Sequence, residues 1–215
     1  MAQQERAIRT RKVVLDAAGA VFAEQGYSAT TIAEILKRAG VTKGALYFHF
    51  PSKQDLARGV IEQAVTEPPR EEELILQSFV DMGLELAYRL PREPVLRGAA
   101  RLAADQGAPD FFGTPWPQWA YRGEQLLNKA KAQGEVLPHV DAAVTSRLLV
   151  GSFTGLQLVA QSEAGAESFQ ELVSRLYDHV LPAVALPGVL MQLDTSVERG
   201  ALLAERKPHK QEAMS

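Results

Sequence analysis

The stretch GVTKGALYFHF, at residues 40–50, brings an ammonium group, a phenol and an imidazole together on Lys43, Tyr47 and His49. No acidic residue stands among them. A lysine can bind a guanine edge or a phosphate, and tyrosine and histidine can donate hydrogen bonds to phosphate oxygens. A helix that only packs would surround its aromatic residues with charges of both signs, so this stretch predicts a surface that binds a polyanion.

Other chemistry has little support in the sequence. The chain has no Cys, and it contains no phosphate-binding loop, dinucleotide glycine motif or nucleophile elbow. The histidines have no partner at metal-ligand spacing; they are His49, His139, His179 and His209. We therefore expect no catalytic residue, no metal site and no cofactor, and we predict that the protein is not an enzyme.

The charge is distributed unevenly along the chain. Residues 1–60 carry nine Lys and Arg against five Asp and Glu, a net charge of +4. The whole chain of 215 residues carries −3, so the remainder carries −7. A basic segment on an acidic body is expected when only that segment contacts nucleic acid, although chance also produces segments of this charge.

The elements that must position these residues are predicted to be helices. Helix-favouring residues dominate, and no two alternating apolar runs are joined by a hairpin turn, so we predict an all-α fold. Apolar residues at helical spacing predict a first helix at about 6–24, with Gly26 as its C-cap. Thr30 or Thr31 can cap a second helix, which stops at Gly40.

Two further helices follow closely. Thr42 can cap a short third helix that ends near Phe48, and Ser52 with Asp55 can cap a fourth that runs to about Val65. The second and third helices, joined by Ala-Gly-Val, form a helix-turn-helix. The third helix can then lie in a major groove of DNA.

The spacing within the third helix separates its two faces. Leu46 and Phe50, four residues apart, would face the core, whereas Lys43 and Tyr47, also four apart, would face outward. Gly40 permits the sharp turn before this helix. The sequence therefore predicts a recognition helix with a polar outer face.

The domain boundary is predicted at residues 66–73, TEPPREEE, because two prolines interrupt the helical pattern there. Residues 1–66 would form a helix-turn-helix DNA-binding domain with its connecting helix. Residues 67–205 would form a larger helical domain for ligand binding and dimerisation. Residues 206–215 are predicted to be a disordered tail.

A long helix predicted at 141–162 is apolar nearly all round, with Arg147 the only charge after its first residue. A soluble helix of this kind has protein on more than one side. Gly151 and Gly155 would let a neighbouring helix approach closely, and a broad apolar stripe follows at 169–181. Paired with their copies in a second subunit, these helices predict a four-helix interface; filling one subunit's own core is the alternative.

An aromatic-rich connection at 105–119 precedes another predicted helix. Trp119, inside that helix, is a candidate for a flat pocket wall, whereas Trp116 is better read as sealing a core edge. Thr154 and Gln157 could fix a hydroxyl or carbonyl of a ligand, or could bond within the dimer interface. The absence of ionisable residues from 148 to 162 favours a neutral ligand.

At the N-terminus, the sequence TTIAEILKRAGVTKGALYFHFPSKQDLA, preceded by AAGAVFAEQGY, resembles the DNA-binding region of TetR-family regulators over about residues 7–60. The segments PWPQW, NKAKAQGEVLPHVD and GSFTGLQLVAQS further resemble the γ-butyrolactone receptors of streptomycetes. That resemblance implies an all-α, two-domain subunit of a dimeric repressor, released from DNA by a small diffusible lactone. It also implies that Trp119 lies against the ligand.

These inferences define three sets of residues. We expect DNA contacts from Arg6, Arg9, Arg11, Thr31, Thr42, Lys43, Gly44, Ala45, Tyr47, Phe48, His49 and Lys53. We expect ligand contacts from Trp119, Thr154, Gln157, Phe153, Leu84 and Tyr88. We expect dimer contacts from Gly151, Gly155, Leu172, Val173, Leu176 and Val180.

The predicted partners are an inverted-repeat DNA operator, a second copy of the chain and a small hydrophobic signal that controls secondary metabolism. No membrane partner is expected: the N-terminus lacks a signal-peptide core, and residues 148–162 are too short and too polar for a span, so we predict a cytoplasmic protein. One alternative is a TetR-like regulator of an antibiotic or other hydrophobic metabolite. Another is a constitutive DNA-binding protein without a ligand.

Overall fold

The computed structural model describes residues 2–65, 72–105, 113–162 and 167–205. Within these ranges the regular structure is helical, and a single isolated bridge, between Val136 and Ala185, stands in place of any strand. The all-α prediction is confirmed. The proline pair of the predicted boundary and the predicted tail at 206–215 lie outside the described residues.

The chain forms two compact units. The first, called the head unit, comprises Met1–Pro68 and Leu90–Trp119, and the second, called the body unit, comprises Pro69–Arg89 and Ala120–Ser215. The division thus falls near the boundary predicted at residue 66, but it differs in one respect. Leu90–Trp119 groups with the head unit, whereas the sequence predicts residues 67–205 to form one C-terminal domain.

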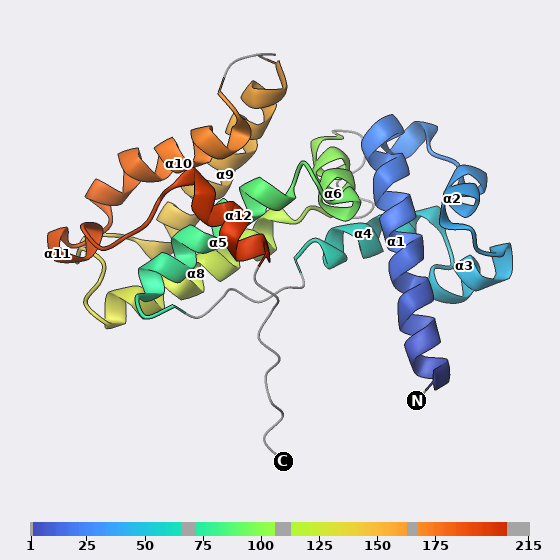
Figure 1. Ribbon diagram of the computed structural model, residues 1–215, viewed down its shortest axis with the longest axis horizontal. Helices are drawn as coiled ribbons and strands as arrows, with labels where there is room; N and C mark the ends of the chain where they lie inside the picture. Colours follow the sequence, from blue (N-terminus) through green and yellow to red (C-terminus); the bar gives the residue numbers. More distant parts are fainter. Residues whose placement is uncertain (1, 66–71, 106–112, 163–166, 206–215) are drawn as a thin grey trace. The chain divides into compact units, whose positions relative to one another are not determined.

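The head unit surrounds one apolar core. Its helices are α1 (Ala2–Ala29), α2 (Ile32–Ala39), α3 (Lys43–His49), α4 (Lys53–Gln63) and α6 (Pro94–Ala104), shown in Figure 1. Phe22, Ile35, Leu46 and Leu56 are fully buried at its centre, one from each of the first four helices. α6 contributes Leu102 to the same core, so five helices share one hydrophobic cluster.

Local capping fixes where these helices begin and end. Thr31 and Glu34 form a reciprocal capping box at the start of α2, and Gly40 ends that helix in the left-handed region at φ 64°. Thr42 and Ser52 accept hydrogen bonds at the N-termini of α3 and α4, as predicted. Inside α1, Gly26 has φ 73° and breaks the helix close to its C-terminal end.

Two glycines explain why α6 belongs to the head unit. A Cβ atom added to Gly98 would lie 2.5 Å from the carbonyl oxygen of Gly19, and one added to Gly19 would lie 2.6 Å from that of Pro94. The backbones of α1 and α6 therefore touch directly. Only residues without a side chain allow helices to cross this closely, and the periodicity of apolar residues does not reveal which glycines will meet.

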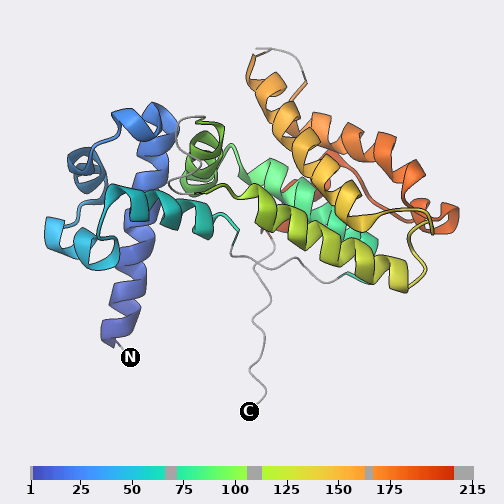
Figure 2. The same ribbon diagram turned by 180° about the vertical axis from the view of Figure 1, so that it is seen from behind.

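The body unit is built around a central helix. Its helices are α5 (Ile75–Arg89), α8 (Trp116–Ala132, whose residues up to Trp119 group with the head unit), α9 (Ala142–Ser162), α10 (Phe169–Val180), η1 (Leu181–Ala183), α11 (Pro187–Leu190) and α12 (Val197–Glu205). Phe79 of α5 lies against Gly123 of α8, and Leu84 lies against Gly200 of α12. α5 is thus enclosed between α8 and α12, as the two opposite views show (Figures 1 and 2).

A buried carboxylate caps the N-terminus of α5 from a distant part of the chain. Glu135 follows Gly134, which turns the chain at φ 75° after α8. Its carboxylate oxygens accept hydrogen bonds from the backbone N–H groups of Ile75 and Leu76 at 3.1 and 2.7 Å. These are donors that a helix leaves unpaired at its start, so Glu135 links α8 to α5.

A polar network fastens the C-terminal segment to α5. Arg199 donates to the buried carboxylate of Asp81, with 2.7 Å between Nη2 and Oδ2, and this charge-assisted contact raises the pKa of Arg199. Gln77 accepts a hydrogen bond from the backbone of Asp194 at 2.8 Å. Burial, with a smaller contribution from Asp81, raises the pKa of Tyr177 on α10, so that its hydroxyl stays protonated.

Candidate DNA-binding and ligand-sensing sites

The recognition helix α3 has the two faces that its spacing predicts. Leu46 and Phe50 are buried in the head core, whereas Lys43 and Tyr47 are exposed. Phe48 has 80% of its surface exposed, which is unusual for a phenylalanine. The helix therefore presents a cation and two aromatic rings to the solvent.

The outer face of α3 is open enough for a close approach. A Cβ atom added to Gly44 would meet nothing within 4 Å. The ammonium group of Lys43 lies 5.8 Å from the centre of the Tyr47 ring, and the rings of Phe48 and His49 meet edge to face at 5.0 Å. Together with the absence of acidic residues in α3, this geometry suits a base edge and neighbouring phosphates.

The predicted contacts on α1 differ from one another. Arg6 and Arg9 are exposed, as phosphate contacts require. The guanidinium of Arg11 instead lies 5.3 Å from the centre of the Phe50 ring, and its Nη1 lies 3.5 Å from Oε1 of Gln63. Arg11 therefore braces α1 against α4 and the end of α3, a role that its position in the sequence did not reveal.

Three other predicted contacts also have partners inside the head unit. The ammonium group of Lys53 lies 4.5 Å from the centre of the Tyr27 ring and donates to the backbone oxygen of Ser28 at 3.4 Å. Partial burial lowers the pKa of Lys53. The hydroxyls of Thr31 and Thr42 serve as N-caps. Their contribution to DNA binding stays a prediction.

The predicted ligand residues fall mainly in the body unit. Leu84 is buried in the body core, and Tyr88 lies one turn further along α5. Phe153 of α9 packs edge to face on Phe169 of α10 at 4.8 Å between ring centres. Thr154 donates its hydroxyl proton to the backbone oxygen of Val150 at 2.9 Å. Gln157 is half-buried on the same helix.

Trp119 lies inside α8, as predicted, and is half-buried. Trp116 is the first residue of that helix and is more exposed. The role of Trp119 as a pocket wall stays a prediction.

α9 leaves an apolar face uncovered. Leu148 has 66% of its surface exposed, Leu158 53%, and Val144 and Val159 over 40%. A Cβ atom added to Gly151 or Gly155 would meet nothing within 4 Å. By length and composition alone α9 could also cross a membrane. One chain therefore covers only one side of this helix.

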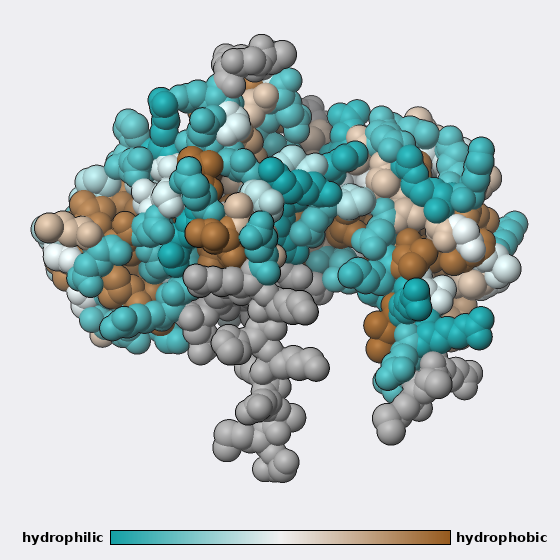
Figure 3. All heavy atoms as spheres, in the orientation of Figure 1, coloured by the Kyte–Doolittle hydropathy of each residue, from teal (hydrophilic) through white to brown (hydrophobic). Residues whose placement is uncertain are grey.

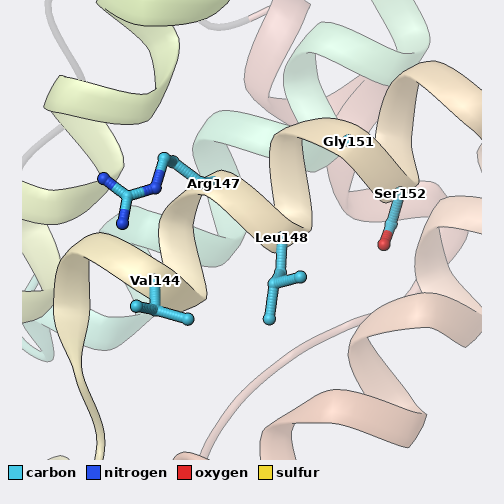
Figure 4. Close-up of a pocket in the computed structure, with 5 residues that line it drawn as sticks. All are labelled: Val144, Arg147, Leu148, Gly151 and Ser152. Atoms are coloured by element: carbon cyan, nitrogen blue, oxygen red, sulfur yellow. The ribbon is translucent and has the colours of Figure 1, made fainter.

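A hollow on this face is shown in Figure 4. It is lined by Val144, Arg147, Leu148, Gly151 and Ser152, all from α9. Val144, Leu148 and Ser152 point toward the same side of the helix, and Arg147 points away from them. The surface is thus apolar with a polar edge, as protein interfaces commonly are.

One predicted dimer contact needs correction. Val173 has no exposed surface and lies in the body core, so it cannot touch a second subunit. The apolar stripe of α10 is wide enough both to pack in the body core and to contact a second subunit. The spacing of its residues alone does not show which of them serve which contact. Leu172, Leu176 and Val180 stay half-exposed on this helix and remain candidates.

The described residues contain no group of three or more His, Asp or Glu side chains placed to hold a metal ion. On the surface, hydrophilic side chains cover most of the face in Figure 3, and apolar ones interrupt them along α1 and around α11.

A helix-turn-helix head with an exposed basic recognition helix defines a DNA-binding regulator, and the comparisons identify its family. Residues 14–60 match the family described as bacterial regulatory proteins, tetR family. The chain is 39% identical over 196 residues to the A-factor receptor protein of Streptomyces griseus, a match that covers 90% of this chain and 70% of the relative. The chain belongs to the tetR family and is a transcriptional repressor of that family.

Two solved structures extend the likeness across both units. TylP, a TetR regulator from Streptomyces fradiae, is 42% identical with a TM-score of 0.85, and the match covers 95% of this chain and 94% of TylP. A γ-butyrolactone receptor described as ArpA-like is 26% identical with a TM-score of 0.70, and the match covers 94% of this chain and all of that one. The predicted family and the predicted resemblance to γ-butyrolactone receptors are thereby confirmed.

Proposed function

We propose that the protein is a dimeric repressor that binds an inverted-repeat operator and is released by a small neutral signal of the γ-butyrolactone type. The main support for this class of ligand is the sequence identity to the A-factor receptor protein, which extends over the body unit as well as the head unit. The likeness to a γ-butyrolactone receptor supports the same class.

The proposed mode of DNA binding follows from the outer face of α3. Lys43 would contact a base edge, and Tyr47 and His49 would contact phosphates, while Arg6 and Arg9 would add further phosphate contacts. Each ion pair to phosphate lowers the logarithm of affinity by about 0.9 per log unit of salt. Because one recognition helix reads one half-site, specific binding requires two heads.

The dimer is proposed to form through α9 and the exposed part of α10. An exposed apolar helix needs a cover, and a second copy supplies a matching surface by two-fold symmetry. The polar edge around Arg147 and Ser152 argues against a bilayer as that cover, because a charge inside a membrane is costly. We therefore also propose that the protein works in the cytoplasm.

Release requires the signal to bind the non-DNA-binding conformation more tightly than the binding one. A near-complete reversal needs a preference of about 5 kcal/mol. A small neutral molecule gains that much only by burying most of its surface, so aromatic side chains in the body unit are proposed to enclose it.

The proposal is tested with the full chain in three steps. Light scattering should give twice the 23.5 kDa of one chain at micromolar concentration. Selection from a pool of random duplexes should recover an inverted repeat, and γ-decalactone, a neutral alkyl γ-butyrolactone, should release the selected duplex. A monomer, an asymmetric site or DNA binding insensitive to lactones would each contradict one part of the proposal.

A further inference from the structure

One buried polar atom of the body unit has no partner. The side-chain nitrogen Nε2 of Gln170, in the first turn of α10, is buried without a hydrogen bond in the part of the chain that the structure describes. Buried amide groups are nearly always paired, because an unmade hydrogen bond costs the full desolvation of the group. An unpaired donor of this kind indicates that something else completes it.

Helix geometry places Gln170 on the inner face of α10. It precedes Val173 and Ser174 by three and four residues and Tyr177 by seven, which is the spacing of one helix face. All three of those residues are buried. The amide of Gln170 therefore lies on the side of α10 that faces the interior of the body unit.

The direction in which α10 runs shows which end of α5 lies nearer to Gln170. The chain beyond α10 returns to the start of α5, because Leu186 donates to the backbone oxygen of Glu135, whose carboxylate caps Ile75. Tyr177 packs on Phe79, with 6.3 Å between ring centres. The two helices are thus antiparallel, and Figures 1 and 2 show them running together.

Gln170 lies two turns before Tyr177, about 10 Å toward the C-terminal end of α5. Tyr88, in the last turn of α5, is not part of this contact, because its Cβ atom lies against Gly200 of α12. α9 reaches the same end of the body unit, because Phe153 packs on Phe169, the neighbour of Gln170 in the chain. Phe153, Thr154, Phe169 and Gln170 therefore lie at one end of the body unit.

We infer that Gln170 is a ligand-contacting residue whose side-chain N–H₂ donates a hydrogen bond to a carbonyl oxygen of the signal. This inference rests on the proposed function and adds a specificity-determining residue to it. The apolar part of the ligand would lie against the aromatic side chains of the same end. The hydroxyl proton of Thr154 is already donated to Val150, so this oxygen can only accept, for example from a ligand hydroxyl.

The test compares two probes and two matched variants. γ-Decalactone carries the ring carbonyl, and 2-hexyltetrahydrofuran has the same ring and chain with a methylene in its place. The variants are Gln170→Leu and, as a control, Gln125→Leu, which changes an exposed glutamine of α8. Binding is measured by calorimetry, and the thermal midpoint of the free protein is measured in parallel.

Wild type and Gln125→Leu should bind the lactone about fivefold more tightly than the ether, and Gln170→Leu should bind both alike. The midpoint of free Gln170→Leu should rise by about 2 °C, because the variant no longer buries an unpaired donor. A glutamine that serves only the fold gives the opposite pattern, with a lower midpoint and an unchanged preference for lactone. Gln170→Met provides a second apolar variant of similar length, with the same expected results.

The outcomes separate the two proposals. If wild type prefers the lactone and Gln170→Leu keeps that preference, the role of Gln170 is overturned while the lactone signal stands. If wild type binds neither probe, the lactone class itself is overturned, and with it the carbonyl contact of Gln170.

Discussion

The two units of the molecule handle polar and apolar groups in opposite ways. The head unit closes its apolar core and leaves cations on α1 and α3, together with the rings of Tyr47 and Phe48, exposed. The body unit buries a charged network at Asp81 and Arg199 but leaves the apolar face of α9 uncovered. A surface made for a highly charged partner and a surface made for an apolar one can therefore be recognised by what each unit leaves exposed.

The largest expected effect breaks the buried network of the body unit. Arg199→Leu leaves the carboxylate of Asp81 buried without its partner, which should lower the free energy of unfolding by about 3–5 kcal/mol. Urea denaturation measures this loss. Arg175→Leu is the control, because the Arg175–Glu167 pair is mainly exposed and should contribute little. Equal losses in both variants would contradict the distinction between buried and exposed pairs.

The second prediction concerns the uncovered face of α9. Leu148→Glu places a charge on a residue that is exposed in the single chain, so the fold should stay intact while the proposed dimer dissociates. Light scattering should show the mass falling from a dimer to 23.5 kDa. Met191→Glu alters another exposed apolar residue and should leave the dimer unchanged. A stable dimer of Leu148→Glu would place the interface elsewhere.

The third prediction tests the exposed cation of the head unit. Lys43→Ala should weaken operator binding by about 1–3 kcal/mol through loss of its contact with a base edge or phosphate, and should leave the thermal midpoint unchanged. Gel shifts measure the affinity. Lys37→Ala changes an exposed lysine of α2 that is not among the predicted contacts and provides the comparison. Unchanged affinity of Lys43→Ala would remove the assignment of the recognition helix.

The fourth prediction concerns the response to the signal. Trp119→Ala should leave operator binding intact but make release by γ-decalactone at least tenfold less sensitive, about 1.4 kcal/mol. Trp116→Ala removes the same side chain three residues earlier and should respond like wild type. If Trp119→Ala is released at the wild-type concentration, Trp119 is a packing residue.

The smallest expected effect concerns both units, because a capping box is found among the described residues of each. Hydrogen bonds from Thr31 lower the pKa of Glu34 in the head, and hydrogen bonds from Ser168 lower the pKa of Glu171 in the body. Both folded-state values lie below the ordinary value of 4.5, so each contribution is complete above that pH and is lost as the pH falls through the lowered value.

Glu34→Gln and Glu171→Gln should therefore reduce the dependence of stability on acid pH by similar small amounts. Thermal midpoints between about pH 2 and pH 6 measure this dependence. If the thermal midpoint of the wild type depends on pH no more strongly than that of the double variant, these two carboxylates do not contribute to the acid dependence of stability.

Much of the head unit could be predicted because its signals are local. Thr31, Thr42 and Ser52 stand directly before the helices they cap. The four-residue spacing of Leu46 and Phe50 places both on the inner face of α3. These relations involve residues within one or two turns of each other, where the geometry of a helix determines what can meet.

The contacts that escaped prediction join distant parts of the chain. Glu135 caps a helix that begins 60 residues earlier, and Arg199 reaches Asp81 across 118 residues. Arg11 has the charge of a phosphate contact, but Phe50 and Gln63 hold its guanidinium. Val173 matched the apolar stripe expected of an interface, and only the packing of α10 on α5 shows that it faces inward. The sequence pattern shows which residues are apolar or charged and which helix face they share. It does not show which residue in the fold each of them contacts.

The crossing of α1 and α6 at Gly19 and Gly98 has a mechanical consequence. Most helix pairs are separated by side chains, which can change rotamer and absorb a small displacement of one helix. At Gly19 and Gly98 backbone atoms lie against backbone atoms, so no side chain separates the two helices at the point of contact. The two helices therefore have little room to shift independently at this point, and a methyl group at either glycine would force them apart.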